Sequence, residues 1–298
     1  MTVRPGNAAD SRPATPLWAA GLILMAGFLW SLQGVTIRLL EAATSEQIIF
    51  WRNLAQCSAL ILFIAVRSRG DVVGTIRRAG LLGCLGGTFQ TMSSVTVVFA
   101  FAYTTVANVN FILSTSPFMT GLLAWVILRE RLALRTIIAM AVALGGVGIM
   151  MLDGLAGGHL IGNGLAVFTT LGFSALAIIL RIKRHVDMLP TIFWGAGFGA
   201  IAGFILSGGK IDMPMHDILL CVVMGAIQIG LGQALFVMAS RYVQAALLAF
   251  LSLSEIVLGP IWAWLGVNEV PSELTLVGGG VVIAALVWQA WMGARRTR

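Results

Sequence analysis

The chain has 298 residues, of which 58% are hydrophobic and only 10% are charged. Together with a mean hydropathy of +0.94, this composition excludes a soluble globular protein and indicates a polytopic membrane protein. The net charge of +7 does not indicate nucleic-acid binding, because most basic residues lie in short segments on one side of the apolar stretches. They predict membrane topology and at most a weak attraction to anionic lipid.

Ten apolar segments follow a polar tail at 1–16, which we expect to be disordered and cytoplasmic. Each segment approaches the roughly 20 residues needed to cross a bilayer. They cover residues 17–40, 47–66, 79–102, 105–128, 134–152, 160–180, 189–207, 217–240, 243–266 and 272–292. With the amino terminus inside, the inner segments carry 16 of the 19 basic residues. This distribution predicts an all-α membrane protein of ten transmembrane helices with both termini in the cytoplasm.

The sequence also contains an internal repeat. The stretch at 104–131 is echoed at 243–269 with an offset of 139, which places Glu130 on Glu269, and an offset of 143 places Arg38 on Arg181. The similarity therefore extends well beyond one motif.

The repeat divides the chain into one unit at 17–152 and a second unit at 160–293. Each unit has five expected spans, an odd number, so the second must enter the membrane in the opposite sense. The sequence thus predicts two inverted-topology five-helix repeats around a central cavity.

Both copies of the repeated stretch carry a proline inside an apolar span, Pro117 in the first and Pro260 in the second. A proline within a helix costs about 3 kcal/mol. A membrane bundle tolerates it only where neighbours or a wet cavity satisfy the freed carbonyls. Interrupted helices at matching positions of two halves indicate a transporter's binding site. We therefore expect hinges at these prolines and a site near the bilayer midplane.

The expected cavity combines aromatic walls with neutral hydrogen-bonding groups, a mixture that suits a ligand with an apolar side chain and a polar head. The candidate residues are Trp30, Ser31, Gln33, Phe89, Gln90, Ser93, Asn108, Asn110, Phe111, Ser114, Phe173, Ser174, Gln228 and Ser252. Each aromatic residue taken alone is better explained by core packing. The polar residues at mid-depth carry more weight, since lipid cannot satisfy them.

Glu255 lies near the expected bilayer centre, where an ionised carboxylate is costly and indicates function by default. Three roles stay open: a protonation site that couples transport to a proton gradient, a contact with a substrate amine, and a structural hydrogen bond or ion pair with a neighbour such as Arg52. Arg52 lies about 9 Å along its helix from the outer end. Its guanidinium either snorkels to the interface or points at the cavity.

The fifth and tenth spans contain glycine clusters and no intramembrane charge. We expect them to pack against neighbouring helices or against a second copy, which would form a homodimer through these two spans. The cysteines Cys57, Cys84 and Cys221 lie in apolar spans at unrelated positions. We expect free thiols and no disulfide, metal site or cofactor.

Taken together, the motifs resemble the drug/metabolite transporter superfamily, and specifically its ten-span EamA group. The residues that carry the resemblance are Trp30-Ser31, Arg52, Ser116-Pro117, Leu128 to Arg131, Ser254-Glu255 and Asn268-Glu269. The resemblance covers nearly the whole chain. One departure is Ile256, where the group usually has proline. Pro260 comes one turn later, so we expect the bend of the ninth span nearer the outer face.

The resemblance implies a basket of helices in which spans one, three, four, six, eight and nine line the cavity. Spans five and ten then lie outside it. The resemblance also implies transport of small metabolites, often amino acids, and the chain is most similar to YddG-type aromatic amino acid exporters. We therefore expect a secondary transporter that exports small amphipathic metabolites, with amino acids including aromatic ones favoured. Export would cross the bacterial inner membrane by alternating access.

Two other classes of function stay open. One is a membrane-embedded sensor or assembly subunit without transport activity. The other is an intramembrane enzyme, but such enzymes usually cluster His, Asp or Cys residues within or beside their spans. Here His159, His185 and His216 are scattered over loops and fit no metal spacing.

Overall fold

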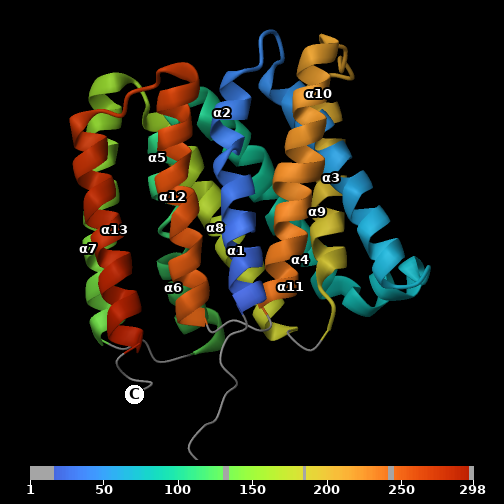
Figure 1. Cartoon of the computed structure of the whole chain (residues 1–298), viewed down its shortest axis with the longest axis horizontal. Coiled ribbons are helices and arrows are strands. Elements are labelled where there is room, and N and C mark those ends of the chain that lie inside the picture. Colours follow the sequence, from blue (N-terminus) through green and yellow to red (C-terminus); the bar gives the residue numbers. More distant parts are fainter. Residues whose placement is uncertain (1–16, 130–133, 184–185, 241–244, 295–298) are drawn as a thin grey trace, which may run out of the picture.

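The computed structural model describes residues 17–129, 134–183, 186–240 and 245–294. Within these ranges the helices form ten rods, some built from two or three consecutive elements (Figure 1). The first five are α1 (Leu17–Ser31) with α2 (Gln33–Arg38), α3 (Ser45–Arg67), α4 (Val72–Tyr103), α5 (Val106–Leu113) with α6 (Ser116–Leu128), and α7 (Leu134–Gly157). The last five are α8 (Leu160–Ile182), α9 (Leu189–Leu206), α10 (Met215–Val223) with η1 (Met224–Leu231) and α11 (Gly232–Ser240), α12 (Ala245–Val267), and α13 (Glu273–Ala294). The tail at 1–16 lies outside the described residues.

Composition and length identify these rods as membrane spans. Seven are long and apolar enough to cross a bilayer, and shorter apolar helices in the described residues cover Thr136–Leu152, Val257–Val267 and Glu273–Trp288. Consecutive rods alternate in direction, so α1 begins and α13 ends at the same end of the bundle (Figure 1). We call this the terminal end and the opposite one the distal end. With five rods in each half, the two halves run in opposite directions.

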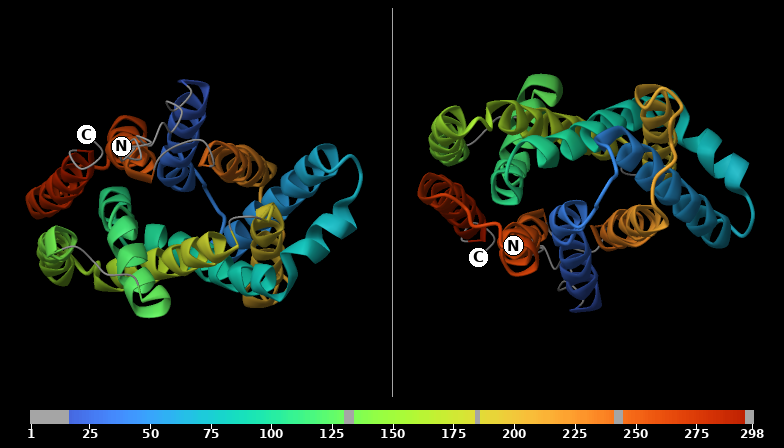
Figure 2. Two further views of the ribbon diagram at one scale, coloured as in Figure 1. Left: turned by 90° about the horizontal axis from the view of Figure 1, so that it is seen from below. Right: turned by 90° about the horizontal axis from the view of Figure 1, so that it is seen from above.

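The glycine clusters of the fifth and tenth rods pack against each other within the chain. These rods, α7 and α13, lie together at one edge of the bundle (Figure 2). A Cβ atom on Gly146 would lie 2.6 Å from the carbonyl oxygen of Gly278. A Cβ atom on Gly278 would likewise lie 2.6 Å from the carbonyl oxygen of Gly146. Their backbones therefore approach as closely as small residues permit. The predicted homodimer through these rods stays a prediction.

The glycine stripe of α9 packs between α3 and α4. A side chain at Gly195 would meet Gln90, whereas one at Gly199 would meet Asn53. One at Gly203 would meet the backbone of Phe50. These three glycines therefore set how close α9 lies to both neighbours.

One of the two rods that carry these prolines is interrupted in the structure, and the roles of Pro117 and Pro260 as hinges stay predictions. The rod of α5 and α6 breaks at Ser114 and Thr115. Pro117 lies in the first turn of α6, where a backbone N–H has no partner within the helix, so its missing N–H costs no hydrogen bond. The hydroxyls of Ser114 and Thr115 donate to the carbonyls of Phe111 and Ile112 at 2.5 and 2.7 Å.

The second copy is not broken, because α12 continues as one helix through Pro260. A single interior proline bends a helix without ending it when the turns on both sides keep their own hydrogen bonds. An unpredicted irregularity occurs instead in the neighbouring rod, where η1 is a π-helix.

The α7–α13 contact makes a testable prediction. Replacing Gly146 by alanine places a Cβ against the backbone of α13, and we expect the free energy of unfolding to fall by about 1–3 kcal/mol. Gly145 provides the matched control, because a Cβ there meets nothing within 4 Å and alanine favours helix by up to about 1 kcal/mol. Thermal unfolding in detergent should separate the two variants. Equal midpoints would contradict the packing described.

Candidate functional site

A cavity of about 620 Å³ lies inside the bundle. Its aromatic wall residues are Trp30, Phe101, Phe173 and Phe236. Its neutral polar wall residues are Gln33, Gln90, Ser93, Ser94, Asn110, Ser114, Ser116, Thr120, Thr169, Thr170 and Gln233. Three ionisable residues, Arg52, Arg181 and Glu255, complete the polar part, and aliphatic side chains fill the rest. Of the described residues that line the cavity, none belongs to α7 or α13.

Ten of the residues singled out in the sequence meet in this wall. They are Trp30, Gln33, Gln90, Ser93, Asn110, Ser114 and Phe173 of the predicted cavity set, the hinge residue Pro117, and the ionisable residues Arg52 and Glu255. Their contact with a substrate stays a prediction. Ser252 lies in α12, but its side chain is outside the described part of the structure.

Six predicted cavity residues lie elsewhere, and three of them are on α1, α8 and η1. The Ser31 hydroxyl donates to the Phe28 carbonyl at 2.7 Å and accepts from the Trp262 indole at 3.0 Å. Ser174 donates to the Ser116 carbonyl at 3.2 Å, next to the α5–α6 break.

Gln228 of η1 donates to the Thr36 hydroxyl at 2.9 Å. Ser31, Ser174 and the amide nitrogen of Gln228 thus bond within the protein, whereas Gln228 Oε1 has no partner among the described residues.

The other three predicted cavity residues outside this wall are Asn108, Phe89 and Phe111. Asn108 donates to Thr104 at 3.0 Å and accepts from Thr275 at 2.6 Å. Phe89 packs against the apolar cluster of α4 and α8. Phe111 faces away from the cavity, with its ring against Gly279 of α13.

Sequence reasoning missed several wall residues that a helical period would have found. On α4 the wall residues recur from Gln90 through Ser94 and Val97 to Phe101. Those on α8 recur from Thr169 through Phe173 and Leu176 to Leu180. Spacings of three and four residues define one face of a helix. Extending the period from the predicted residues Gln90 and Phe173 therefore identifies the complete stripes.

Arg52 does not snorkel to the interface and does not pair with Glu255. Its side chain is only 1% exposed, and Nη2 donates to both the carbonyl and the hydroxyl of Ser94. Within the described residues no ion pair joins Arg52 to Glu255, although both line the cavity. Three roles therefore stay predictions for Glu255: proton coupling, contact with a substrate amine, and a structural bond with a neighbour other than Arg52.

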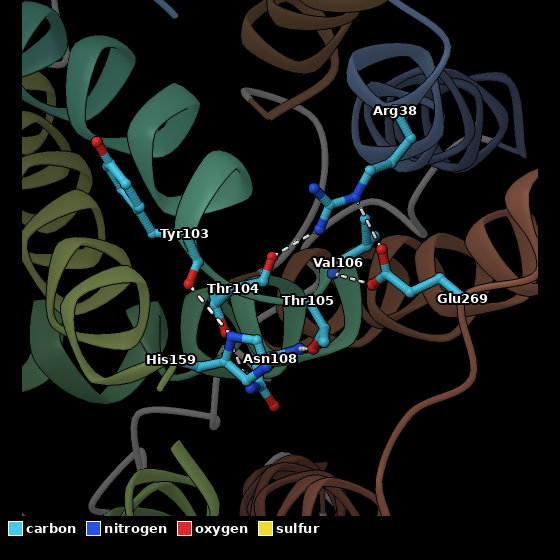
Figure 3. A network of polar contacts seen from close by, with 8 residues as sticks. All are labelled: Arg38, Tyr103, Thr104, Thr105, Val106, Asn108, His159 and Glu269. Carbon is cyan, nitrogen blue, oxygen red and sulfur yellow. Dashed lines mark hydrogen bonds and ion pairs between the residues drawn. The ribbon is translucent and has the colours of Figure 1, made fainter. Parts of the chain in front are cut away.

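The distal end of the bundle carries a polar network centred on Arg38 and Glu269 (Figure 3). Arg38 Nε donates to Glu269 at 2.8 Å, and its Nη2 donates to the Thr104 carbonyl at 2.7 Å. The other Glu269 oxygen accepts from the backbone N–H of Val106. Thr104 caps the end of α4 and Val106 begins α5. The cation therefore lies at a helix C-terminus and the anion at a helix N-terminus, the favourable placement for each.

Comparisons with known proteins agree with this architecture. The model of the EamA-like transporter family matches residues 17–152 and 160–290. Solute carrier family 35 member G1 from Mus musculus is 22% identical over 293 residues, which cover 92% of this chain and 78% of that protein. The pseudopaline exporter CntI from Pseudomonas aeruginosa is 22% identical over 271 residues, which cover 89% of this chain and 93% of the exporter.

A solved crystal structure shows the same fold. It superposes with a TM-score of 0.68 at 15% identity and covers 94% of this chain and 99% of its own. The family model extends over both halves of the sequence, each of which contributes walls to the cavity. The chain therefore belongs to the EamA-like transporter family and is a multi-pass membrane carrier, not an enzyme.

Proposed function

We propose that the chain is a secondary transporter that exports small amphipathic metabolites across the bacterial inner membrane, with amino acids, including aromatic ones, as the favoured substrates. The observation that carries this proposal is the cavity of about 620 Å³ with aromatic walls and neutral polar groups. Its volume lies within the roughly 300–1,000 Å³ typical of small-molecule sites. The relative described as an exporter supports the direction of transport.

The wall composition favours a ligand with two chemically different ends. Trp30, Phe173 and Phe236 offer flat apolar surfaces, while Gln90 and Asn110 offer amide donors and acceptors. Lipid-facing helices do not carry such amides, since the hydrocarbon core provides no hydrogen-bond partner. An amino acid with an apolar side chain matches both kinds of surface.

Alternating access follows from two opposed repeats in this proposal. The termini lie on the cytoplasmic side, so the distal end faces outward. At that end the network links Arg38 of α2 and Glu269, which follows α12, to the turn between α4 and α5 by hydrogen bonds. This network must separate when the cavity opens outward, and the broken rod of α5 and α6 provides a bend close to it.

The competing function is a sensor or assembly subunit that binds a solute without moving it. A counterflow screen over the amino acids in proteoliposomes tests the proposal, because only a transporter exchanges external labelled solute for internal unlabelled solute. We expect accumulation of at least one aromatic amino acid. Binding without counterflow for the whole amino acid set would favour the sensor.

Glu255 provides a test of proton coupling. The Glu255→Gln variant keeps the size and hydrogen-bonding capacity of the side chain but cannot exchange a proton. We expect it to fold and bind substrate yet lose flux driven by a proton gradient, measured in proteoliposomes with an imposed pH difference. Glu273→Gln is the matched control, since this exposed carboxylate begins α13. Unchanged pH dependence in Glu255→Gln would eliminate proton coupling through this residue.

The distal network makes a separate prediction about conformation. Arg38→Gln or Glu269→Gln should raise the fraction of molecules that are open at the distal end by about threefold or more. A partly exposed ion pair contributes up to about 1 kcal/mol to the closed state, and the hydrogen bonds of this pair to the backbone add to this. Spin labels on cysteines at Leu39 and Leu160, both on exposed surface at that end, would report the change as longer distances. The native cysteines are first replaced by alanine.

Arg67→Gln is the control for this experiment, because it removes an ion pair at the terminal end, with Asp187. Distance distributions identical to the wild type in both distal variants would show that the network does not hold this end closed.

A further inference from the structure

The guanidinium of Arg52 is a buried charge in the cavity wall whose hydrogen-bonding capacity is only partly used. Arg52 is 1% exposed, and Nη2 bonds to Ser94. Its Nε and Nη1 atoms have no partner within the described residues. A guanidinium has five N–H donors, so the three carried by these two nitrogens are unsatisfied.

This arrangement is costly unless an anion completes it. Arginine stays protonated in proteins, and charges inside a membrane protein normally pair with an opposite charge. No carboxylate of the described residues forms an ion pair with Arg52. Glu255, the one carboxylate among the described residues of the cavity wall, forms no ion pair with it.

The surroundings fix Arg52 in position. The Ser94 hydroxyl, which accepts a hydrogen bond from Arg52 Nη2, donates to Asn53 Oδ1 at 2.8 Å. The guanidinium is therefore oriented by a chain of hydrogen bonds. A Cβ on Gly225 of η1 would overlap the Arg52 carbonyl oxygen, which shows how closely this π-helix packs on α3. π-helical turns occur frequently at functional sites. The guanidinium of Arg52 is thus preorganised for binding a ligand.

We infer that Arg52 is the anchor for a carboxylate group of the transported solute. The inference rests on the proposed function and deepens it by naming the substrate class as carboxylates. A carboxylate is an acceptor-only group, and arginine–carboxylate bonds are among the strongest hydrogen bonds in proteins. The solute's apolar part then lies against the aromatic wall residues, such as Trp30 and Phe236.

The experiment compares carboxylates with the corresponding primary amides, which lack the carboxylate charge, on purified protein in lipid nanodiscs. Phenylalanine is compared with phenylalaninamide, and phenylacetate with phenylacetamide, by isothermal titration and thermal stabilisation. We expect each amide to bind the wild type at least about tenfold more weakly, the effect of losing a charged hydrogen-bond partner. This arm needs no variant, and equal affinity of acid and amide overturns the inference.

The second arm assigns the preference to Arg52. Arg52→Gln should bind the acids about tenfold or more weakly while its affinity for the amides stays unchanged, which abolishes the discrimination. Arg67→Gln on the same helix is the control, because its side chain is 41% exposed and lies outside the cavity. A folded Arg52→Gln protein that still prefers acids over amides overturns the inference.

The two arms also separate this inference from the proposed function. Counterflow of amino acids together with an acid preference independent of Arg52 would overturn only the inference. A preference for phenylacetate that depends on Arg52, without counterflow of any amino acid, would support the inference and contradict the proposed function.

Discussion

The hydrocarbon core of the membrane provides no hydrogen-bond partners, and the placement of every polar group in this chain depends on that constraint. Among the described residues, many polar side chains at membrane depth either bond to another part of the protein or line the cavity. Ser31 and Asn108 take the first course. Gln90 and Asn110 line the cavity. The two sets together explain why an apolar bundle contains a polar interior.

The same constraint governs the irregular backbone. The break between α5 and α6 frees carbonyl groups, and the hydroxyls of Ser114, Thr115 and Ser174 donate to carbonyls around it. At the distal end, Arg38 and Glu269 satisfy the last carbonyl of α4 and the first N–H of α5. Neighbouring hydroxyls and side chains from distant parts of the sequence thus supply partners at these two places. The irregular regions can therefore change shape without leaving polar groups in lipid.

Sequence reasoning found the features that repeat along the chain. Hydropathy and the spacing of basic residues predicted helical spans where the structure has its ten rods, and the internal offset indicated two equivalent halves. The break near Pro117 was also predicted. These features depend on local composition and period, which a single sequence contains.

The assignment of single polar residues was less successful for a physical reason. Ser93 and Ser31 look alike in the sequence, but one lines the cavity and the other bonds to Trp262. The difference depends on helix rotation and on neighbours more than 200 positions away, as for Ser31 and Trp262. The continuity of α12 through Pro260 was not predictable, because a proline alone does not reveal whether a helix bends or ends. The wall stripes of α4 and α8 were recoverable, since they follow a simple helical spacing.

The central claim is that the polar residues at membrane depth share a cavity that admits solute. The most direct test is modification of single cysteines by a small, charged, membrane-impermeant thiol reagent, in protein whose native cysteines are replaced by alanine. Ser93→Cys in the cavity wall is compared with Leu144→Cys on the exposed face of α7. The account predicts that the reagent modifies the cysteine at 93, that a transported solute protects it, and that the cysteine at 144 stays unmodified. No reaction at 93 from either side of the membrane would contradict it.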